Sequence, residues 1–120
     1  ITASVPPLPQ GEAGNGLLEQ LLAIDPAACA RLIDSAIDSH RQLIAQLQQC
    51  QQHADTLSLA HTLKGGARLL NARRLEKLCQ RLEESESDDA RLDELRQEVV
   101  KEVQVVEAAL LHRRRALNIE

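Results

Sequence analysis

The chain contains no phenylalanine, tyrosine, tryptophan or methionine among its 120 residues. Any core must therefore be aliphatic, and close packing of such side chains suits aligned helices better than a β-sandwich. Leucine, alanine, glutamine, glutamate and arginine dominate the composition, and all of them favour helices. β-Branched residues are sparse before residue 99. These features together predict an all-α fold.

Charge and hydropathy exclude several classes of protein. The formal net charge is -4 at pH 7, whereas a nucleic-acid-binding domain is usually basic. No apolar run approaches the ~20 residues that a membrane-spanning helix needs, and the first residues lack the pattern of a signal peptide. The three cysteines include no C-x-x-C pair and are typical of a reducing compartment. We therefore expect no nucleic-acid partner, no membrane contact by this segment and a cytoplasmic location.

Composition also divides the chain into a linker and one domain. Prolines and glycines are concentrated in residues 1–15, which we interpret as a Pro/Gly-rich linker. Residues 16–115 have the length and the apolar periodicity of a single helical domain. Residues 116–120 are interpreted as a C-terminal tail.

Apolar residues recur at helical spacing in five segments of the domain. A short leading segment, residues 17–22, predicts a helix that docks as a lid. Asp25 as N-cap and Pro26 at the first helical position then open a long helix that ends near residue 50. Three more helices are predicted over about 55–70, around Leu75 to Leu82, and over about 89–113. Short connections favour antiparallel neighbours, so the predicted fold is an antiparallel four-helix bundle with a short additional N-terminal helix.

The third predicted helix contains a histidine followed one turn later by two adjacent glycines. Each interior glycine costs a helix about 1 kcal/mol relative to alanine, so Gly65 and Gly66 need a reason. His61, Lys64, Gly65 and Arg68 fall on one helical face, away from the apolar stripe. That face combines an imidazole with two cations and bare backbone. We interpret His61 as a phosphorylatable histidine that another protein approaches closely.

Residues 60–83, AHTLKGGARLLNARRLEKLCQRLE, resemble the signature of histidine-containing phosphotransfer (HPt) domains. The matching residues are His61, Lys64, Gly65, Leu75, Cys79, Leu82 and Glu83. The order of the predicted helices fits this family from about residue 17 to residue 112. Asn71 stands where the family usually has glycine, and asparagine also tolerates the left-handed conformation that ends a helix.

The resemblance implies a covalent phosphoryl carrier and not an enzyme. His61 would accept a phosphoryl group from the aspartate of one receiver domain and pass it to another. Lys64 would offset the phosphoryl charge, and Gly65 would remove bulk where the receiver approaches. Glu83 would hydrogen-bond the other ring nitrogen of His61 and orient the imidazole. No cofactor is expected in this domain, because the receiver would supply Mg²⁺ and an acidic pocket.

A basic surface is expected to dock the receiver. Residues 60–81 carry six cations against one glutamate, a net charge of +5, which complements an acidic pocket. The candidate docking residues are Leu57, Arg68, Arg73, Arg74 and Lys77. The resemblance is to HPt modules at the C-terminal end of bacterial hybrid sensor histidine kinases. It therefore implies receivers acting in cis or in trans, the cytoplasmic end of a membrane-bound kinase, and a domain that is monomeric in isolation.

Other interpretations of the same residues stay open. A non-catalytic helical adaptor or a dimerisation bundle would need no phosphorylated histidine, and its charges would be ordinary solvated faces. Histidine-kinase dimerisation domains commonly have glutamate directly after the histidine, whereas Thr62 follows here. Cys50 and His53 have the spacing of two zinc ligands, but no second pair accompanies them. His40 is expected at the edge of the core, and His53 in a solvated polar turn.

Overall fold

The computed structural model of the chain describes residues 16–117, which form five helices. They are α1 (Leu17–Ile24), α2 (Pro26–Gln49), α3 (His53–Leu69), α4 (Arg73–Glu83) and α5 (Leu92–Leu117). No strand occurs among these residues, so the predicted all-α class and the short leading helix are confirmed. The predicted linker, residues 1–15, and residues 118–120 of the predicted tail lie outside the described part of the chain.

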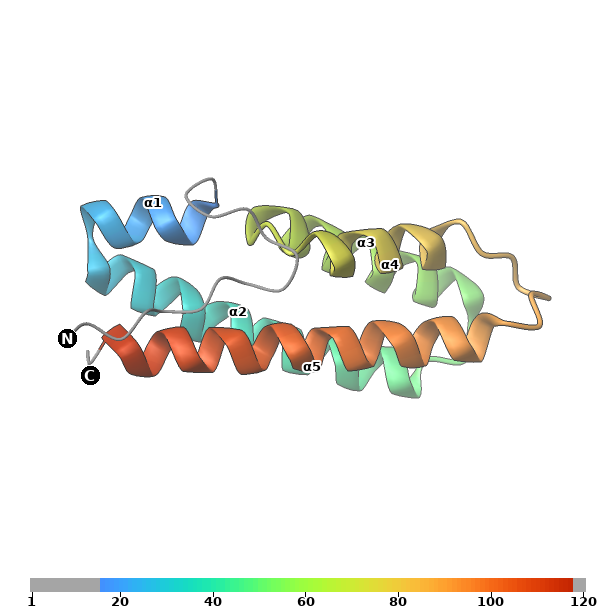
Figure 1. The fold of residues 1–120 in the computed structure, drawn as a ribbon. Helices are drawn as coiled ribbons and strands as arrows, with labels where there is room; N and C mark the ends of the chain where they lie inside the picture. The colour runs from blue at the N-terminus through green and yellow to red at the C-terminus, as the bar shows by residue number, and fades with distance from the viewer. Residues whose placement is uncertain (1–15, 118–120) are drawn as a thin grey trace.

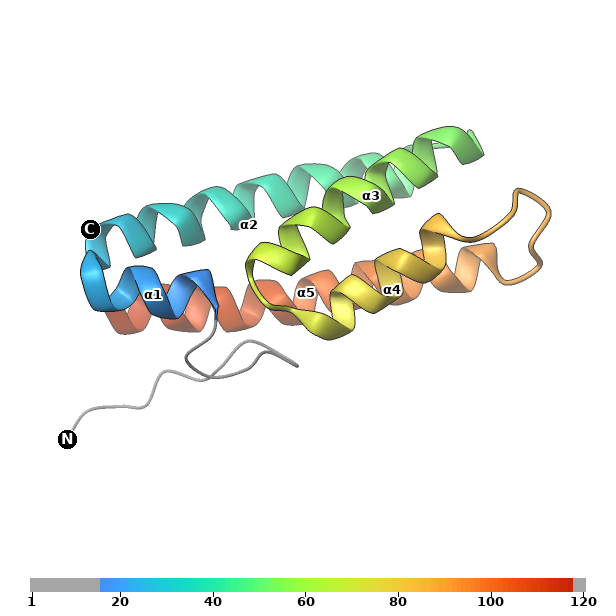
Figure 2. The same cartoon turned by 90° about the horizontal axis from the view of Figure 1, so that it is seen from above.

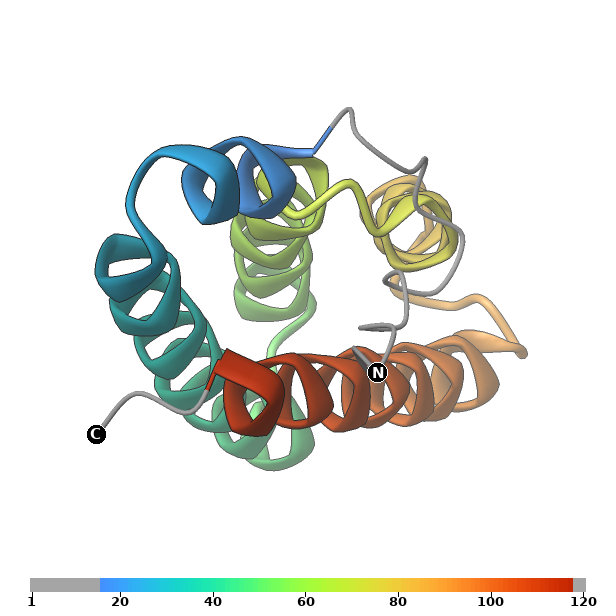
Figure 3. The same cartoon turned by 60° about the vertical axis from the view of Figure 1, so that its left-hand side comes forward.

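The helices α2 and α5 run along the length of the molecule (Figure 1). On one side of them lie α1 and the α3–α4 pair, one after the other (Figure 2). Viewed from one end, α2, α3, α4 and α5 stand around a common centre (Figure 3). Neighbouring helices pack on one another around this centre: α2 on α3, α3 on α4, α4 on α5 and α5 on α2. Within this set of four, each helix therefore packs on two others, and α2 also packs on α1.

Aliphatic side chains and two cysteines fill the space between the helices. The fully buried members include Leu18, Ile33, Leu47, Leu63, Leu75, Leu82, Val99, Val103, Val106 and Leu110. Burying one such side chain contributes about 1.5–3 kcal/mol. Burial also raises the pKa of the Cys79 thiol to about 12, so this residue stays protonated and packs as a small apolar group. Within residues 16–117, every helix is too short or too polar to span a lipid bilayer.

The short helix α1 covers the end of the core where α2 begins. Leu18 is fully buried, and its carbonyl oxygen lies 3.6 Å from Cys29 Sγ on α2. Glu19 forms an ion pair with Arg113 of α5, whose side chain is itself buried. The helix therefore docks as a lid, as predicted, and contacts both α2 and α5.

Helix α2 begins as predicted, whereas the start of α3 differs. Asp25 Oδ1 accepts a hydrogen bond from the backbone N–H of Ala28 at 3.2 Å, and Pro26 is the first helical residue. The prediction of a solvated turn at His53 is wrong, because this residue begins α3 and is half-buried. Its Nε2 donates to the backbone carbonyl of Ser85 at 2.9 Å. The contact joins the start of α3 to the segment that follows α4.

Both predicted ends of the last helix are wrong. Asp89 Oδ1 accepts a hydrogen bond from the backbone N–H of Arg91 at 2.8 Å, which forms a turn where the helix was expected to begin. The helix therefore starts at Leu92. It continues to Leu117, past the predicted end near residue 113, so the first two residues of the predicted tail are helical.

The connection between α3 and α4 is a Schellman motif. Asn71 has a φ of 58°, and its N–H donates to the carbonyl of Arg68 at 3.2 Å. The next N–H, that of Ala72, donates to the carbonyl of Ala67 at 2.9 Å, which completes the motif. Ala67 and Ala72 are both buried. The prediction that Asn71 adopts the left-handed conformation at the end of the helix is confirmed.

A buried histidine packs between α2 and α3. His40 is 3% exposed, and its Nδ1 has no hydrogen-bond partner among the described residues. A Cβ added at Gly66 would lie 3.5 Å from His40 Nε2, an ordinary contact that alanine would tolerate. Burial lowers the pKa of His40, while Glu107 of α5 acts in the opposite direction. Protonation of this imidazole therefore opposes folding.

We expect the free energy of unfolding to fall as the pH is lowered from about 7.5 to about 5.5. In the unfolded chain His40 has an ordinary pKa of about 6.5, so it binds a proton more readily there than in the folded chain. Urea titrations at both pH values measure this change. His40→Leu removes the titrating group and should make the change smaller, while the exposed residue His112 serves as control through His112→Gln. Equal pH dependence in the wild type and His40→Leu would contradict the assignment.

Candidate functional site

His61 lies on the outward face of α3, beside α4. Its side chain is 72% exposed, and its Nδ1 lies 3.0 Å from Glu83 Oε2. Lys64 follows one turn later, with its Nζ 2.5 Å from Glu83 Oε1. One carboxylate of α4 therefore contacts two side chains of α3. The structure thus brings together three of the site residues selected from the sequence.

Glu83 is ionised in this arrangement. Contact with the Lys64 ammonium lowers the pKa of the carboxyl, the hydrogen bond with His61 lowers it further, and burial acts in the opposite direction. Lys64 Nζ and Glu83 Oε1 form an ion pair. The Lys64 side chain is only 14% exposed. Solvent therefore screens the pair less than it screens a pair on an open surface.

The ionised carboxylate determines which nitrogen of His61 carries the proton. A carboxylate only accepts hydrogen bonds, so Nδ1 must be the donor. In the neutral imidazole, Nε2 then has the free lone pair. Because the side chain is largely exposed, that lone pair is available to a partner arriving from solvent. The result is a nucleophile that is oriented by a neighbouring carboxylate.

The polar contacts between α3 and α4 form a regular ladder. Its three pairs are His61–Glu83 at 3.0 Å, Lys64–Gln80 at 2.9 Å and Arg68–Glu76 at 2.8 Å. Each step forward along α3 is matched by an equal step backward along α4, so these two helices run in opposite directions. Arg68 is thus engaged by Glu76, about two turns from His61. Lys64 contacts two residues of α4 at once.

Gly65 lies on the exposed face next to His61. Apart from its chain neighbours and the backbone of its own helix, a Cβ added at this position would meet no atom of residues 16–117 within 4 Å. The packing inside the described chain therefore gives no reason for a glycine, although glycine weakens a helix by about 1 kcal/mol relative to alanine. The open space is on the side from which a partner would reach the imidazole.

The predicted docking residues are spread over several surfaces. Leu57 lies one turn before the histidine on α3 and is half-buried, while Arg73 and Lys77 are exposed on α4. Arg74 instead faces α5, where its Nε lies 3.2 Å from Oε1 of Glu102. The Glu102 side chain is 8% exposed, so this ion pair belongs to the packing of α4 on α5.

Glu76 and Gln80 were not selected from the sequence. Their positions nevertheless follow from spacing, because the α3 residues of the ladder are three and then four apart, and the α4 residues are four and then three apart. In antiparallel helices joined by a short turn, such mirrored spacings bring side chains together in pairs. These mirrored spacings are visible in the sequence. They identify Glu76 and Gln80, however, only when it is known which face of α4 packs toward α3.

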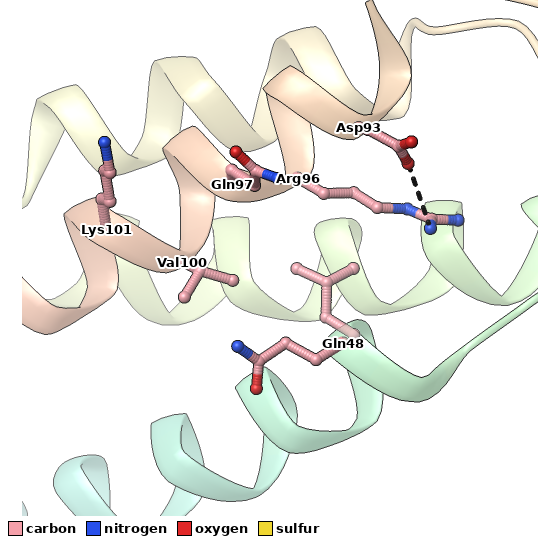
Figure 4. Close-up of a pocket in the computed structure, with 7 residues that line it drawn as sticks. Gln48, Asp93, Arg96, Gln97, Val100 and Lys101 are labelled. Atoms are coloured by element: carbon pink, nitrogen blue, oxygen red, sulfur yellow. Dashed lines mark ion pairs between the residues drawn. The ribbon is translucent and has the colours of Figure 1, made fainter.

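A hollow of about 450 Å³ lies away from this cluster, between α2 and α5 (Figure 4). Leu47, Val100 and Arg96 are among its lining residues, and Arg96 forms an ion pair with Asp93 at 3.8 Å. No residue of α3 or α4 lines it. Among residues 16–117, no three His, Cys, Asp or Glu side chains are grouped so that they would hold a metal ion. The site at His61 is thus separate from this hollow and lies on the exposed surface of α3 and α4.

We expect neutral His61 to carry its proton on Nδ1. Long-range ¹H–¹⁵N correlation spectra at a pH where the ring is neutral would then show a protonated Nδ1 and an unprotonated Nε2. Glu83→Leu should abolish this preference, because the ring loses the carboxylate that holds the proton. A wild-type spectrum dominated by the Nε2-protonated form would contradict the arrangement.

Comparison with known families agrees with the geometry of the site. The family model of the Hpt domain matches residues 27–110, a range that includes His61, Lys64, Gly65 and Glu83. Comparisons with curated proteins and with solved structures give no match. The matched range covers most of the chain and spans α2 to α4 and much of α5. The chain therefore belongs to the Hpt domain family, whose members carry phosphohistidine as an intermediate of phosphoryl transfer in phosphorelays.

Proposed function

We propose that this domain accepts a phosphoryl group on His61 Nε2 from the aspartate of one receiver domain and passes it to the aspartate of another. The observation that carries the proposal is the hydrogen bond between His61 Nδ1 and Glu83 Oε2, at 3.0 Å on a side chain that is 72% exposed. It leaves the second nitrogen unprotonated and accessible. No other described histidine combines exposure with a carboxylate that orients the ring.

The proposed step needs no proton transfer. The lone pair of Nε2 attacks the phosphorus of the phosphoaspartate, and an N–P bond forms as the P–O bond to the aspartate breaks. The electron pair of that bond leaves with the aspartate carboxylate. The ring keeps its Nδ1 proton and gains positive charge, which the ionised Glu83 stabilises. In the second transfer the acceptor carboxylate attacks the phosphorus, and the electron pair of the N–P bond returns to Nε2.

Lys64 supplies a positive charge next to this site. Its ammonium is anchored to Glu83 at 2.5 Å and to Gln80 at 2.9 Å. A phosphoryl group brings a charge of about -2, and the anchored ammonium offsets part of it. In this proposal Mg²⁺ and the acidic pocket belong to the receiver, which supplies the other half of the reaction centre.

The proposed partner surface surrounds His61 on α3 and continues onto α4. Gly65 provides clearance next to the imidazole, Leu57 provides an apolar contact, and Arg73 and Lys77 provide positive charge. We propose that α2 to α5 act as an antiparallel four-helix bundle that holds this surface rigid. On the resemblance alone, we also propose that the domain is monomeric and is tethered to the cytoplasmic end of a bacterial hybrid sensor kinase. Its receivers would act in cis or in trans.

Phosphorylation of His61 is the direct test. Incubation with a ³²P-labelled phospho-receiver domain should produce a label that is lost in acid and retained in base. His61→Gln should remain unlabelled while keeping the circular dichroism spectrum of the wild type. A wild type that takes up no label, or equal labelling of His61→Gln, would reject the relay function and favour a helical adaptor.

Gly65→Leu tests the clearance assigned to this glycine. At Cβ the new side chain meets no atom of the described residues beyond its own helix backbone, so the free energy of unfolding should stay the same or rise by about 1 kcal/mol. Transfer from the phospho-receiver should nevertheless fall by at least about tenfold, because the bulk stands where the receiver approaches. Gly66→Ala is the matched control, since its Cβ makes only an ordinary contact with His40. Unchanged transfer in Gly65→Leu would show that no partner needs the space.

A further inference from the structure

The side chain of Gln80, on α4 beside the site, contacts two charged groups. The carboxamide of Gln80 lies between Lys64 and Glu84, with its Oε1 2.9 Å from Lys64 Nζ and its Nε2 2.7 Å from Glu84 Oε2. Together with the contacts of Glu83, this forms a continuous chain of polar contacts from Glu84 to His61. Gln80 is the link between the end of α4 and the ammonium.

Both neighbours determine the orientation of this amide. An ammonium only donates hydrogen bonds and a carboxylate only accepts them, so the oxygen of Gln80 must face Lys64 and its nitrogen must face Glu84. A glutamate at position 80 would meet the negative charge of Glu84, and a lysine or arginine would meet the positive charge of Lys64. A neutral amide is therefore suited to bridge these two groups.

The position of Glu84 supports a role for this bridge. Glu84 is the C-cap residue of α4, where a negative charge is unfavourable because the helix dipole is negative at that end. Its hydrogen bond with Gln80 offsets this effect. At the other end of the bridge the Lys64 side chain is only 14% exposed, whereas Gln80 and Glu84 are themselves exposed.

We infer that Gln80 is a positioning residue for phosphoryl transfer, which holds the Lys64 ammonium next to Glu83 and His61 without adding a negative charge. This inference rests on the function proposed above. The amide restricts the ammonium to the seam between α3 and α4, so less reorganisation is needed when the phosphoryl group arrives. Because Gln80 is neutral, Glu83 provides the only carboxylate in contact with the ammonium among the described residues.

The first test is Gln80→Met, which keeps a long unbranched side chain and removes both hydrogen bonds. Single-turnover transfer from the phospho-receiver should slow by about fivefold, the effect of losing one hydrogen bond of about 1 kcal/mol. The dissociation constant for the receiver should stay unchanged, and the urea midpoint should fall only slightly, through the loss of the exposed bond to Glu84. Gln104→Met, at an exposed position of α5, is the matched control and should transfer at the wild-type rate.

The second variant, Gln80→Glu, distinguishes positioning from simple packing. Its added carboxylate repels the incoming phosphoryl group, so transfer should slow at low salt and partly recover at high salt relative to the wild type. The defect of Gln80→Met should not recover in this way. In ¹⁵N spectra, the Lys64 ammonium should exchange its protons with water faster in Gln80→Met than in the wild type, which reports the loss of the anchor directly.

The possible outcomes are distinct. A wild type that takes up no phosphoryl label rejects the proposed function and, with it, this inference. A labelled wild type with unaltered transfer and unaltered ammonium exchange in Gln80→Met overturns the role of Gln80 alone. A slower transfer that is fully explained by weaker receiver binding also overturns it, because Gln80 would then be a docking residue. Slower transfer with unchanged binding and faster ammonium exchange supports it.

Discussion

The carboxylate of Glu83 is the group on which the arrangement around His61 depends. Its two oxygens contact His61 and Lys64, so one side chain of α4 orients a nucleophile and anchors a cation on α3. The ammonium keeps the carboxylate ionised, and the carboxylate holds the proton of the neutral imidazole on Nδ1. Such mutual dependence is typical of polar networks, whose members contribute more together than separately.

Many positive charges near His61 are neutralised by glutamates of the same chain, so the number of cations overstates the charge that a partner meets. Residues 60–81 carry six cations, but Lys64, Arg68 and Arg74 each contact a glutamate of the same chain. A partner therefore meets a weaker positive field than the net charge of the segment implies. Long-range electrostatic attraction therefore contributes less to the binding of a partner, and the shape of the surface around the exposed imidazole contributes more.

Much of the fold follows from patterns that act locally. The all-α class follows from composition, the start of α2 from Asp25 and Pro26, and the end of α3 from the ability of Asn71 to adopt a positive φ. The start of α5 was missed because the side chain of Asp89 forms a turn in place of the first helical residues. His53 was missed because its partner, Ser85, lies far away in the sequence. The contacts of Gln80 and Arg74 likewise depend on which face of α4 meets which neighbour, and this is determined only when all the helices are packed.

The three-residue turn around Asn71 has a consequence for how this domain tolerates change. The Schellman motif fixes the rotation of α4 relative to α3, and all three pairs of the ladder share that single register. One inserted residue would rotate the whole of α4 by about 100°, since a helix turns once every 3.6 residues. Glu83, Gln80 and Glu76 would then leave their partners simultaneously, and Leu75, Leu78 and Leu82 would leave the core with them. The length of this loop is therefore as tightly constrained as the chemistry of His61, although none of its atoms takes part in that chemistry.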